Sequence, residues 1–184
     1  MNITIILSSV RENRLADNVL KKVKELIGDR FAFSMVDPME YNLPLLNKRY
    51  YEMKDPTADF QKLHNLFLNT DAFILITAEY NHSVPPALVN MLDHFGEEFK
   101  YKACGIISYS DGPIGGARSG EQLRLICSTL GMPPIPISAA WGLAHKADAP
   151  EGKSFRENFE KTFTRFIDQL FWYGEAYLAK RKSL

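Results

Sequence analysis

The sequence predicts an α/β fold: a doubly wound parallel sheet of five strands in the order 2-1-3-4-5, with helices on both faces. Two observations predict a parallel α/β sheet with helices between its strands. Short apolar runs alternate along the chain with longer stretches whose apolar residues recur every three or four positions. The short runs are rich in β-branched residues and almost free of charge, which is typical of strands buried on both faces of a parallel sheet.

Each element has its own local signal. The apolar runs predict strands at 2–8, 31–36, 72–77, 103–109 and 134–138. The amphipathic stretches predict helices at 15–27, 57–69, 86–95, 117–130 and about 153–182. Thr57 is expected to cap the second helix, Pro86 to occupy the first turn of the third, and Gly131 to end the fourth. Because no repeat or linker interrupts this order, residues 1–184 are expected to form a single domain.

Composition limits the classes of function. The 22 basic and 22 acidic residues cancel, so nucleic-acid binding is not expected. No run approaches the roughly 18 consecutive apolar residues of a membrane span, and the first residues lack the basic region of a signal peptide. Cys104 and Cys127 lie in apolar runs without metal-like spacing, which indicates buried thiols in a reducing compartment and no metal site. We therefore expect a cytoplasmic protein.

Three unusual loops follow the first, third and fourth predicted strands. In an open parallel sheet, ligands bind beyond the carboxyl ends of the strands, at the point where the winding reverses. The predicted strand order brings these three loops together beside the first and third strands. A ligand site is therefore expected where the loops meet.

The first loop, 8–14 (SSVRENR), leads straight into a helix. Its two hydroxyl groups, its two guanidinium groups and the free N–H groups of the helix suit a phosphate dianion. Alternatively, Arg11 and Arg14 are surface residues and the serines only end a strand. The sequence has neither GxGxxG after the first strand nor GxxxxGK[ST], so a dinucleotide-binding fold of that type and a P-loop enzyme are not expected. Asp37 before Pro38 is interpreted as a turn residue.

The second and third loops suit a planar heterocycle. The second, 78–86 (AEYNHSVPP), can present backbone groups to a ring edge while Tyr80 or His82 flanks a ring face. His82 is interpreted as a solvated loop histidine in preference to a catalytic acid. The third loop, 110–118 (SDGPIGGAR), has three glycines, which permit close approach of the backbone to a ligand. Taken alone, it is equally well a mobile tight turn.

Taken together, the loops carry a family pattern. The sequence has SSVR at 8–11 where the family has G-S-x-R, and AEYNHSVPP at 78–86 where the family has P-E-Y-N-x-S-x-P-G. It has GGAR at 115–118, followed by QLR at 122–124. In this respect the chain resembles the NADPH-dependent FMN reductase family, the flavodoxin-like group that includes chromate, quinone and azo-dye reductases. Three positions depart from the pattern: glycines are replaced by Ser8 and Pro86, and a proline by Ala78.

The resemblance implies a flavodoxin-like FMN enzyme that oxidises NAD(P)H and reduces quinones, azo compounds, chromate or flavin by ping-pong hydride transfer. It implies that the FMN phosphate is held by Ser9, Arg11, Arg14 and the amides of Leu15 and Ala16. It implies that the isoalloxazine is bordered by Glu79, Tyr80, Asn81 and His82, with Ser83 nearby, and that the other side of the cofactor is approached by Ser110 and Gly112. Since FMN supplies the chemistry, no catalytic side chain is predicted.

Two other functions stay open at this point. The chain could be a flavodoxin-like electron carrier that does not oxidise NAD(P)H, although carriers usually find their partners through net charge. It could also be a non-enzymatic flavin-binding protein that acts on a partner protein. The resemblance further implies a homodimer or homotetramer. The sequence leaves undecided the physiological acceptor, the preference for NADH or NADPH, and the role of residues 41–55.

Overall fold

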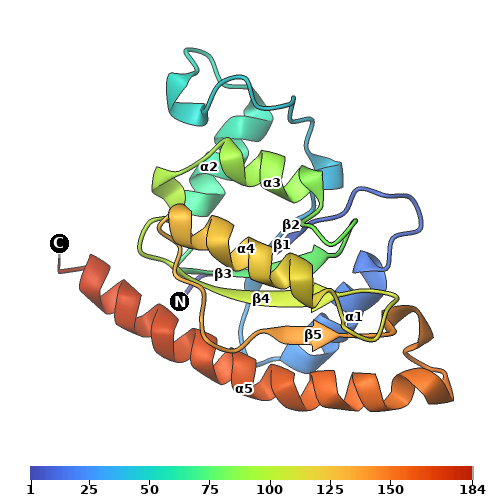
Figure 1. Ribbon diagram of the computed structural model, residues 1–184. Coiled ribbons are helices and arrows are strands. Elements are labelled where there is room, and N and C mark those ends of the chain that lie inside the picture. Colours follow the sequence, from blue (N-terminus) through green and yellow to red (C-terminus); the bar gives the residue numbers. More distant parts are fainter. Residues whose placement is uncertain (184) are drawn as a thin grey trace.

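The computed structural model describes residues 1–183, and at its centre is a five-stranded sheet in the order β2-β1-β3-β4-β5 (Figure 1). The strands are β1 (Ile3–Leu7), β2 (Phe33–Val36), β3 (Ala72–Ala78), β4 (Ala103–Tyr109) and β5 (Ala139–Trp141). Every neighbouring pair is parallel. The three central strands β1, β3 and β4 are buried along their whole length, as their apolar runs predict. The predicted fold class and strand order are therefore confirmed.

Helices cover both faces of the sheet, as a doubly wound fold requires (Figure 1). One face carries α1 (Ala16–Ile27) and α5 (Pro150–Arg181). The other face carries α2 (Ala58–Leu68), α3 (Pro86–Asp93) and α4 (Ala117–Thr129). Short 3₁₀ helices lie in the connections: η1 (Pro38–Glu40), η2 (Tyr50–Glu52), η3 (Glu97–Phe99) and η4 (Ala144–Lys146).

The sheet separates two hydrophobic cores. Successive strand residues point to opposite faces, so Ile5 packs in the core beneath α1 and α5, whereas Ile6 packs in the core beneath the other helices. The long helix α5 approaches β4 so closely that a Cβ atom at Gly105 would collide with the ring of Phe166. The buried aromatic face of α5 therefore packs on the sheet, and a glycine in the middle of β4 makes room for it.

The main difference from the predicted elements concerns the fifth strand. It lies at Ala139–Trp141 and not at 134–138. The earlier segment forms only an isolated bridge between Pro134 and Cys104. The sequence at 133–136 is PPIP, and proline has no N–H group to donate to a strand ladder. The chain therefore pairs with β4 only after the prolines have passed.

The ends of the helices follow the local signals with small shifts. Pro86 occupies the first turn of α3, as predicted, and Pro150 does the same for α5, which begins three residues earlier than expected. Gly131 follows α4 with a φ of +71°, a conformation that glycine adopts without strain. Thr57 precedes α2 in an extended conformation, but its side chain makes no capping hydrogen bond within the described chain.

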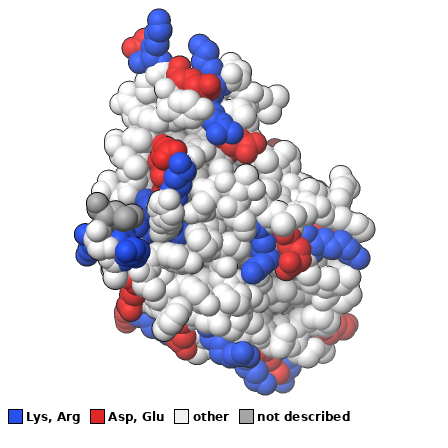
Figure 2. Space-filling view, turned by 60° about the vertical axis from the view of Figure 1, so that its left-hand side comes forward, with Lys and Arg blue, Asp and Glu red and all other residues white. Residues whose placement is uncertain are grey.

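Residues 41–55, whose role the sequence left open, lie over α3. The side-chain oxygen of Asn90 accepts a hydrogen bond from the N–H of Leu46 at 2.9 Å, and its amide nitrogen donates to the carbonyl of Pro44 at 2.9 Å. On the face shown in Figure 2, basic side chains lie beside acidic ones in small mixed clusters. Among residues 1–183, none of the helices is both long enough and apolar enough to cross a membrane.

Candidate functional site

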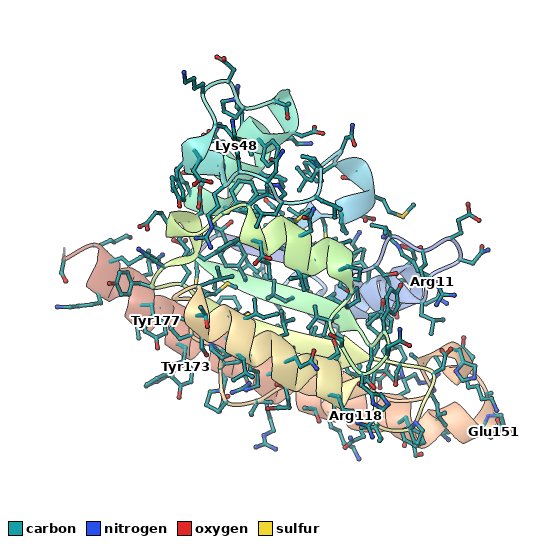
Figure 3. The ribbon with its side chains drawn as sticks, turned by 45° about the horizontal axis from the view of Figure 1, so that its top comes forward. Arg11, Lys48, Arg118, Glu151, Tyr173 and Tyr177 are labelled. Atoms are coloured by element: carbon teal, nitrogen blue, oxygen red, sulfur yellow. The ribbon has the colours of Figure 1, made fainter. Side chains whose placement is uncertain are left out.

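The three loops meet at the carboxyl ends of β1, β3 and β4, where they surround a cavity of about 590 Å³. Figure 3 shows Arg11 and Arg118, which come from the first and third loops, at this same end of the molecule. A further wall is contributed by His145 of η4. The loops are far apart in the sequence, and the parallel pairing of the strands brings them together.

Most of the residues predicted to bind the cofactor line this cavity: Ser9, Arg11, Arg14, Leu15, Glu79, Tyr80, His82, Ser110 and Gly112. The other three do not line it. Ala16 is fully buried in the first turn of α1, where only its backbone could serve a ligand. Asn81 is exposed, and the side chain of Ser83 turns to α4, where its hydroxyl donates to Gln122 at 2.8 Å.

The first loop presents hydrogen-bond donors around the start of α1. The N-cap position of this helix is Leu15, and no side chain among residues 1–183 caps the first turn. The hydroxyl of Ser9 forms a hydrogen bond with the hydroxyl of Tyr80, which joins the first loop to the second. The guanidinium of Arg11 lies 5.7 Å from the centre of the Tyr80 ring, in a cation–π contact. The N–H groups that begin α1 thus remain available to an anion.

Arg14 is engaged by the protein itself. Its guanidinium donates to both carboxylate oxygens of Asp37, to Asp17 and to the carbonyl of Ser9, and its side chain is only 7% exposed. The hydrogen bond to Asp37 raises the pKa of Arg14 against the opposing effect of burial. Arg14 therefore fixes the first loop to the end of β2.

Asp37 has a larger role than the turn assigned to it from the sequence. Its carboxylate does accept the N–H of Met39 at 3.0 Å, as expected for a turn residue. Burial by itself would raise the pKa of Asp37, but the hydrogen bonds from Arg14 and Met39 and the charge of Arg14 lower it overall. Asp37 stays ionised and serves as the main partner of Arg14.

The second loop is held by hydrogen bonds to the first loop and to α4. The N–H of Ala78 donates to the hydroxyl of Ser8 at 2.9 Å, and the hydroxyl of Ser119 donates to the carbonyl of Ala78 at 2.7 Å. These contacts explain two departures from the family pattern together. A proline at position 78 would have no N–H group, and a glycine at position 8 would have no hydroxyl to accept one. The paired residues Ser8 and Ala78 replace them with a hydrogen bond.

The turn of the second loop is fixed by its own backbone. Tyr80 and Ser83 exchange two N–H···O bonds of 3.0 and 2.9 Å. Between them, Asn81 and His82 adopt left-handed conformations with φ values of 50° and 63°. His82 is exposed, in agreement with its interpretation as a solvated loop residue. The rigid turn presents backbone atoms at one wall of the cavity.

Glu79 closes the second loop onto the third. Its carboxylate accepts the N–H groups of Arg118 at 3.1 Å and of Ser119 at 3.4 Å, in the first turn of α4. The guanidinium of Arg118 lies 3.5 Å from the same carboxylate. A carboxylate at this position interacts favourably with the positive end of the helix dipole. The N-terminus of α4 is therefore already occupied by an anionic group of the protein.

The third loop folds back on the ends of β4 and β5. Gly115 and Gly116 have φ values of 67° and 72°. A Cβ atom at Gly116 would lie 2.7 Å from the carbonyl oxygen of Tyr109, and one at Gly115 would lie 2.8 Å from the nitrogen of Gly142. The glycines thus allow close approach between protein segments, and the loop is more than a free tight turn.

Several residues at the cavity were not predicted as site residues. Arg118 belongs to the GGAR motif, so the motif itself was the signal that could have included it. Tyr109 lines the cavity as the last residue of β4, which places it directly before the third loop. His145 could not be placed from the sequence, because the residues of η4 show no hydrophobic periodicity. Its Nδ1 atom lies 3.5 Å from the carboxylate of Asp111.

Comparison with known proteins identifies the family. The profile of the NADPH-dependent FMN reductases matches residues 1–146. The chain belongs to the NADPH-dependent FMN reductase family. It therefore joins a family of oxidoreductases named for a nicotinamide reductant and a flavin. The match covers β1 to η4 and includes all three loops.

Individual proteins with similar sequences or a similar fold support this family assignment. A quinone reductase from Pseudomonas putida is 26% identical over 145 residues, which cover 76% of each chain. An NAD(P)H-dependent FMN reductase from Schizosaccharomyces pombe is 30% identical over 149 residues, which cover 75% of the present chain and 71% of that relative. The flavoenzyme NAD(P)H:(acceptor) oxidoreductase FerB from Paracoccus denitrificans has the same fold, with a TM-score of 0.79, 22% identity and coverage of 94% and 98%.

Proposed function

We propose that this chain is an FMN-dependent NAD(P)H oxidoreductase that reduces small acceptors such as quinones, azo compounds, chromate or free flavin. One observation carries the proposal: the uncapped start of α1 and two rigid polar loops line the same cavity at the carboxyl ends of β1, β3 and β4. This is where an open parallel sheet binds its ligand. The family membership of the chain supports the same assignment.

The residues around the start of α1 fit a phosphate group. In the proposal, the phosphate accepts hydrogen bonds from Ser9, from the Arg11 guanidinium and from the amides of Leu15 and Ala16. Arg14 lines the same cavity, but its hydrogen bonds go to carboxylates and to the Ser9 carbonyl. Its proposed part in phosphate binding is therefore to hold the loop in place and to add positive charge nearby.

The residues of the second and third loops fit a planar ring. Glu79, Tyr80, Asn81 and His82 are proposed to border the isoalloxazine mainly through their backbone, with Ser83 fixing the turn and Ser110 and Gly112 on the other side. The polar side chain of Glu79 is engaged by α4, which supports contact through the backbone. When bound, FMN would accept a hydride from NAD(P)H and pass the electrons to the acceptor in a ping-pong sequence. The chain binds and orients both molecules, and no side chain is proposed as catalytic.

We also propose that residues 1–184 act as one domain within a homodimer or homotetramer in the cytoplasm. The surface of α5 supports self-association, because Trp172 is 67% exposed and the centre of its ring lies 4.7 Å from the centre of the Tyr173 ring. Figure 3 shows Tyr173 and Tyr177 along this helix. Aromatic residues of this kind are enriched at protein interfaces. The buried free thiols of Cys104 and Cys127 support a reducing compartment.

The proposal is tested on purified protein reconstituted with FMN. We expect a bound flavin with its visible absorbance bands, and bleaching of these bands when NADPH or NADH is added without oxygen. Addition of a quinone to the reduced protein should then restore the absorbance bands of the oxidised flavin. Protein that binds no FMN even in excess would overturn the proposal. Protein that binds FMN but is not bleached by either nucleotide would instead support an electron carrier.

A further inference from the structure

A second cavity, of about 360 Å³, lies between α1, η4 and the start of α5. Its polar lining comes from one face of α1 and from the segment that runs through η4 into α5. These residues are Asn18, Lys21, Lys22, Glu25, His145, Lys146, Asp148 and Arg156. Positions 18, 21, 22 and 25 are three or four residues apart, so they share one side of α1. Four of the lining residues are lysine or arginine and two carry carboxylates, so the cavity is predominantly basic.

Two of the four cations are paired within the protein. The ammonium of Lys22 lies 2.9 Å from the carboxylate of Glu160 and 3.4 Å from that of Glu25. The guanidinium of Arg156 lies 3.1 Å from the carboxylate of Asp148. Both carboxylates of the lining are thereby engaged, and Lys22 and Arg156 serve as parts of the wall.

The other two cations, Lys21 and Lys146, are available to a ligand. Both are exposed, and neither forms an ion pair with any of residues 1–183. They stand on different elements, Lys21 on α1 and Lys146 on η4. An anion that enters the cavity thus meets two ammonium groups whose charge the described chain does not neutralise. Such groups bind a phosphate as point charges.

The second cavity adjoins the first. His145 of η4 lines both of them, so η4 forms their common wall. Figure 3 shows Glu151, in the first turn of α5, at the same end of the molecule as Arg11 and Arg118 of the first cavity. A ligand that spans the two cavities carries a ring for the first and an anion for the second. NADPH has a nicotinamide at one end and a 2′-phosphate near the other, where NADH has only a hydroxyl.

We propose that the second cavity binds the 2′-phosphate of NADPH between Lys21 and Lys146, while the nicotinamide lies in the first cavity. This inference rests on the proposed function and adds to it the choice between the two nucleotides. A phosphate monoester carries about 1.5 to 2 negative charges at neutral pH, which the two ammonium groups offset. The hydroxyl of NADH gains little from them. The second cavity therefore makes the chain selective for NADPH.

The test measures kcat/KM of the FMN-loaded protein for NADPH and for NADH, with a quinone as the acceptor. The unchanged protein should favour NADPH. In the double variant Lys21→Met/Lys146→Met, kcat/KM for NADPH should fall about 10-fold, as expected for the loss of two exposed charge pairs. The loss should lie in KM, because neither lysine contacts the reacting atoms. The values for NADH should not change.

The matched control is Lys24→Met/Lys161→Met, which removes the same charge from exposed positions of α1 and α5 outside the second cavity. It should leave the values for both nucleotides as they are. The melting temperatures of both double variants should equal that of the unchanged protein, because all four side chains are exposed.

A binding measurement distinguishes the nucleotide from other phosphates. In calorimetry, adenosine 2′,5′-bisphosphate should bind the unchanged FMN-loaded protein, and Lys21→Met/Lys146→Met should bind it about 10-fold more weakly. Adenosine 5′-monophosphate and inorganic phosphate should bind more weakly than the bisphosphate to the unchanged protein. Equal affinity for inorganic phosphate and the bisphosphate would overturn the inference, since the cavity would then be a general anion site.

The kinetic outcomes separate this inference from the proposed function. Equal losses for NADPH and NADH in Lys21→Met/Lys146→Met, or no loss for NADPH, would overturn the inference and leave the proposed function standing. An FMN-loaded protein that oxidises neither nucleotide would instead overturn the proposed function.

Discussion

The helices α1 and α4 both begin at the cavity, but in the described part of the chain only α4 has a side chain of the protein bound to the N–H groups of its first turn. The start of α4 receives the carboxylate of Glu79, which accepts the N–H groups of Arg118 and Ser119. The start of α1 receives no side-chain cap from residues 1–183, although the carboxylate of Asp37 is nearby and bound to Arg14. A helix N-terminus attracts an anion in either case. In the proposed function, α4 is completed by the protein itself and α1 by the phosphate of the cofactor.

The largest effect is expected when the group that keeps Arg14 in place is removed. Asp37→Ala leaves the Arg14 guanidinium, 7% exposed, without its main carboxylate. The free energy of unfolding should fall by about 3 kcal/mol, as expected for a buried pair that loses one member. Urea denaturation measures this change.

The matched control for this variant is Asp168→Ala, which breaks the exposed pair between Arg30 and Asp168. It should cost less than about 1 kcal/mol. Similar losses in the two variants would show that Arg14 and Asp37 form an ordinary surface pair. Binding to Arg14 would then not explain why Asp37 leaves the start of α1 uncapped.

The C-terminal end of α2, away from the cavity, is satisfied by a buried cation. The ammonium of Lys102 donates to the carbonyls of Phe67 and Leu68 at 2.6 and 2.9 Å and so satisfies the end of α2. Burial, helped by the charge of Arg181, lowers the pKa of Lys102 from 10.5 to about 8. Between these two values the unfolded chain binds more protons than the folded one, so stability rises with pH.

The rise should amount to about 2 kcal/mol between pH 8 and pH 10. Lys102→Met should reduce this rise, measured as the difference in unfolding free energy between the two pH values. The exposed Lys21→Met serves as the control and should keep it. An unchanged pH profile in Lys102→Met would contradict the view that the buried ammonium costs free energy at this helix end.

A smaller effect is expected at the contact between the first and second loops. Ser8→Gly leaves the buried N–H of Ala78 without an acceptor and should lower the free energy of unfolding by about 1–2 kcal/mol. The double variant Ser8→Gly/Ala78→Pro has no such N–H group and should recover part of the loss. Thermal or urea unfolding of both variants measures the interaction. Losses that simply add would refute the pairing of these two departures from the family pattern.

The smallest effect is expected at the start of α4. Glu79→Gln keeps oxygen as an acceptor for Arg118 and Ser119 but removes the charge, so the free energy of unfolding should fall by about 1 kcal/mol. The ratio of the affinities for FMN and riboflavin should stay the same. A ratio that falls in Glu79→Gln would show that the phosphate is bound at α4 and not at α1.

The fold could be predicted from sequence because its signals are local. The apolar run at 72–77 and the amphipathic stretch at 15–27 each follow from the spacing of a few neighbouring residues, and the structure has β3 and α1 there. The fifth strand was misplaced for a reason that the sequence also contained. The prolines at 133–136 cannot donate to a ladder, so the apolar residues among them do not pair as a regular strand.

The sequence by itself determined the alternation of strands and helices, the three loops and the residue types that suit a phosphate and a ring. Only the tertiary structure decided the partner of each polar group: Arg14 with Asp37, Glu79 with α4, Ser8 with Ala78, and Tyr109 with none among the described residues. Secondary structure depends on the periods of neighbouring residues, which can be read along the chain. Hydrogen-bond partners depend on distances between segments that are far apart in sequence, and these exist only once the strands have paired.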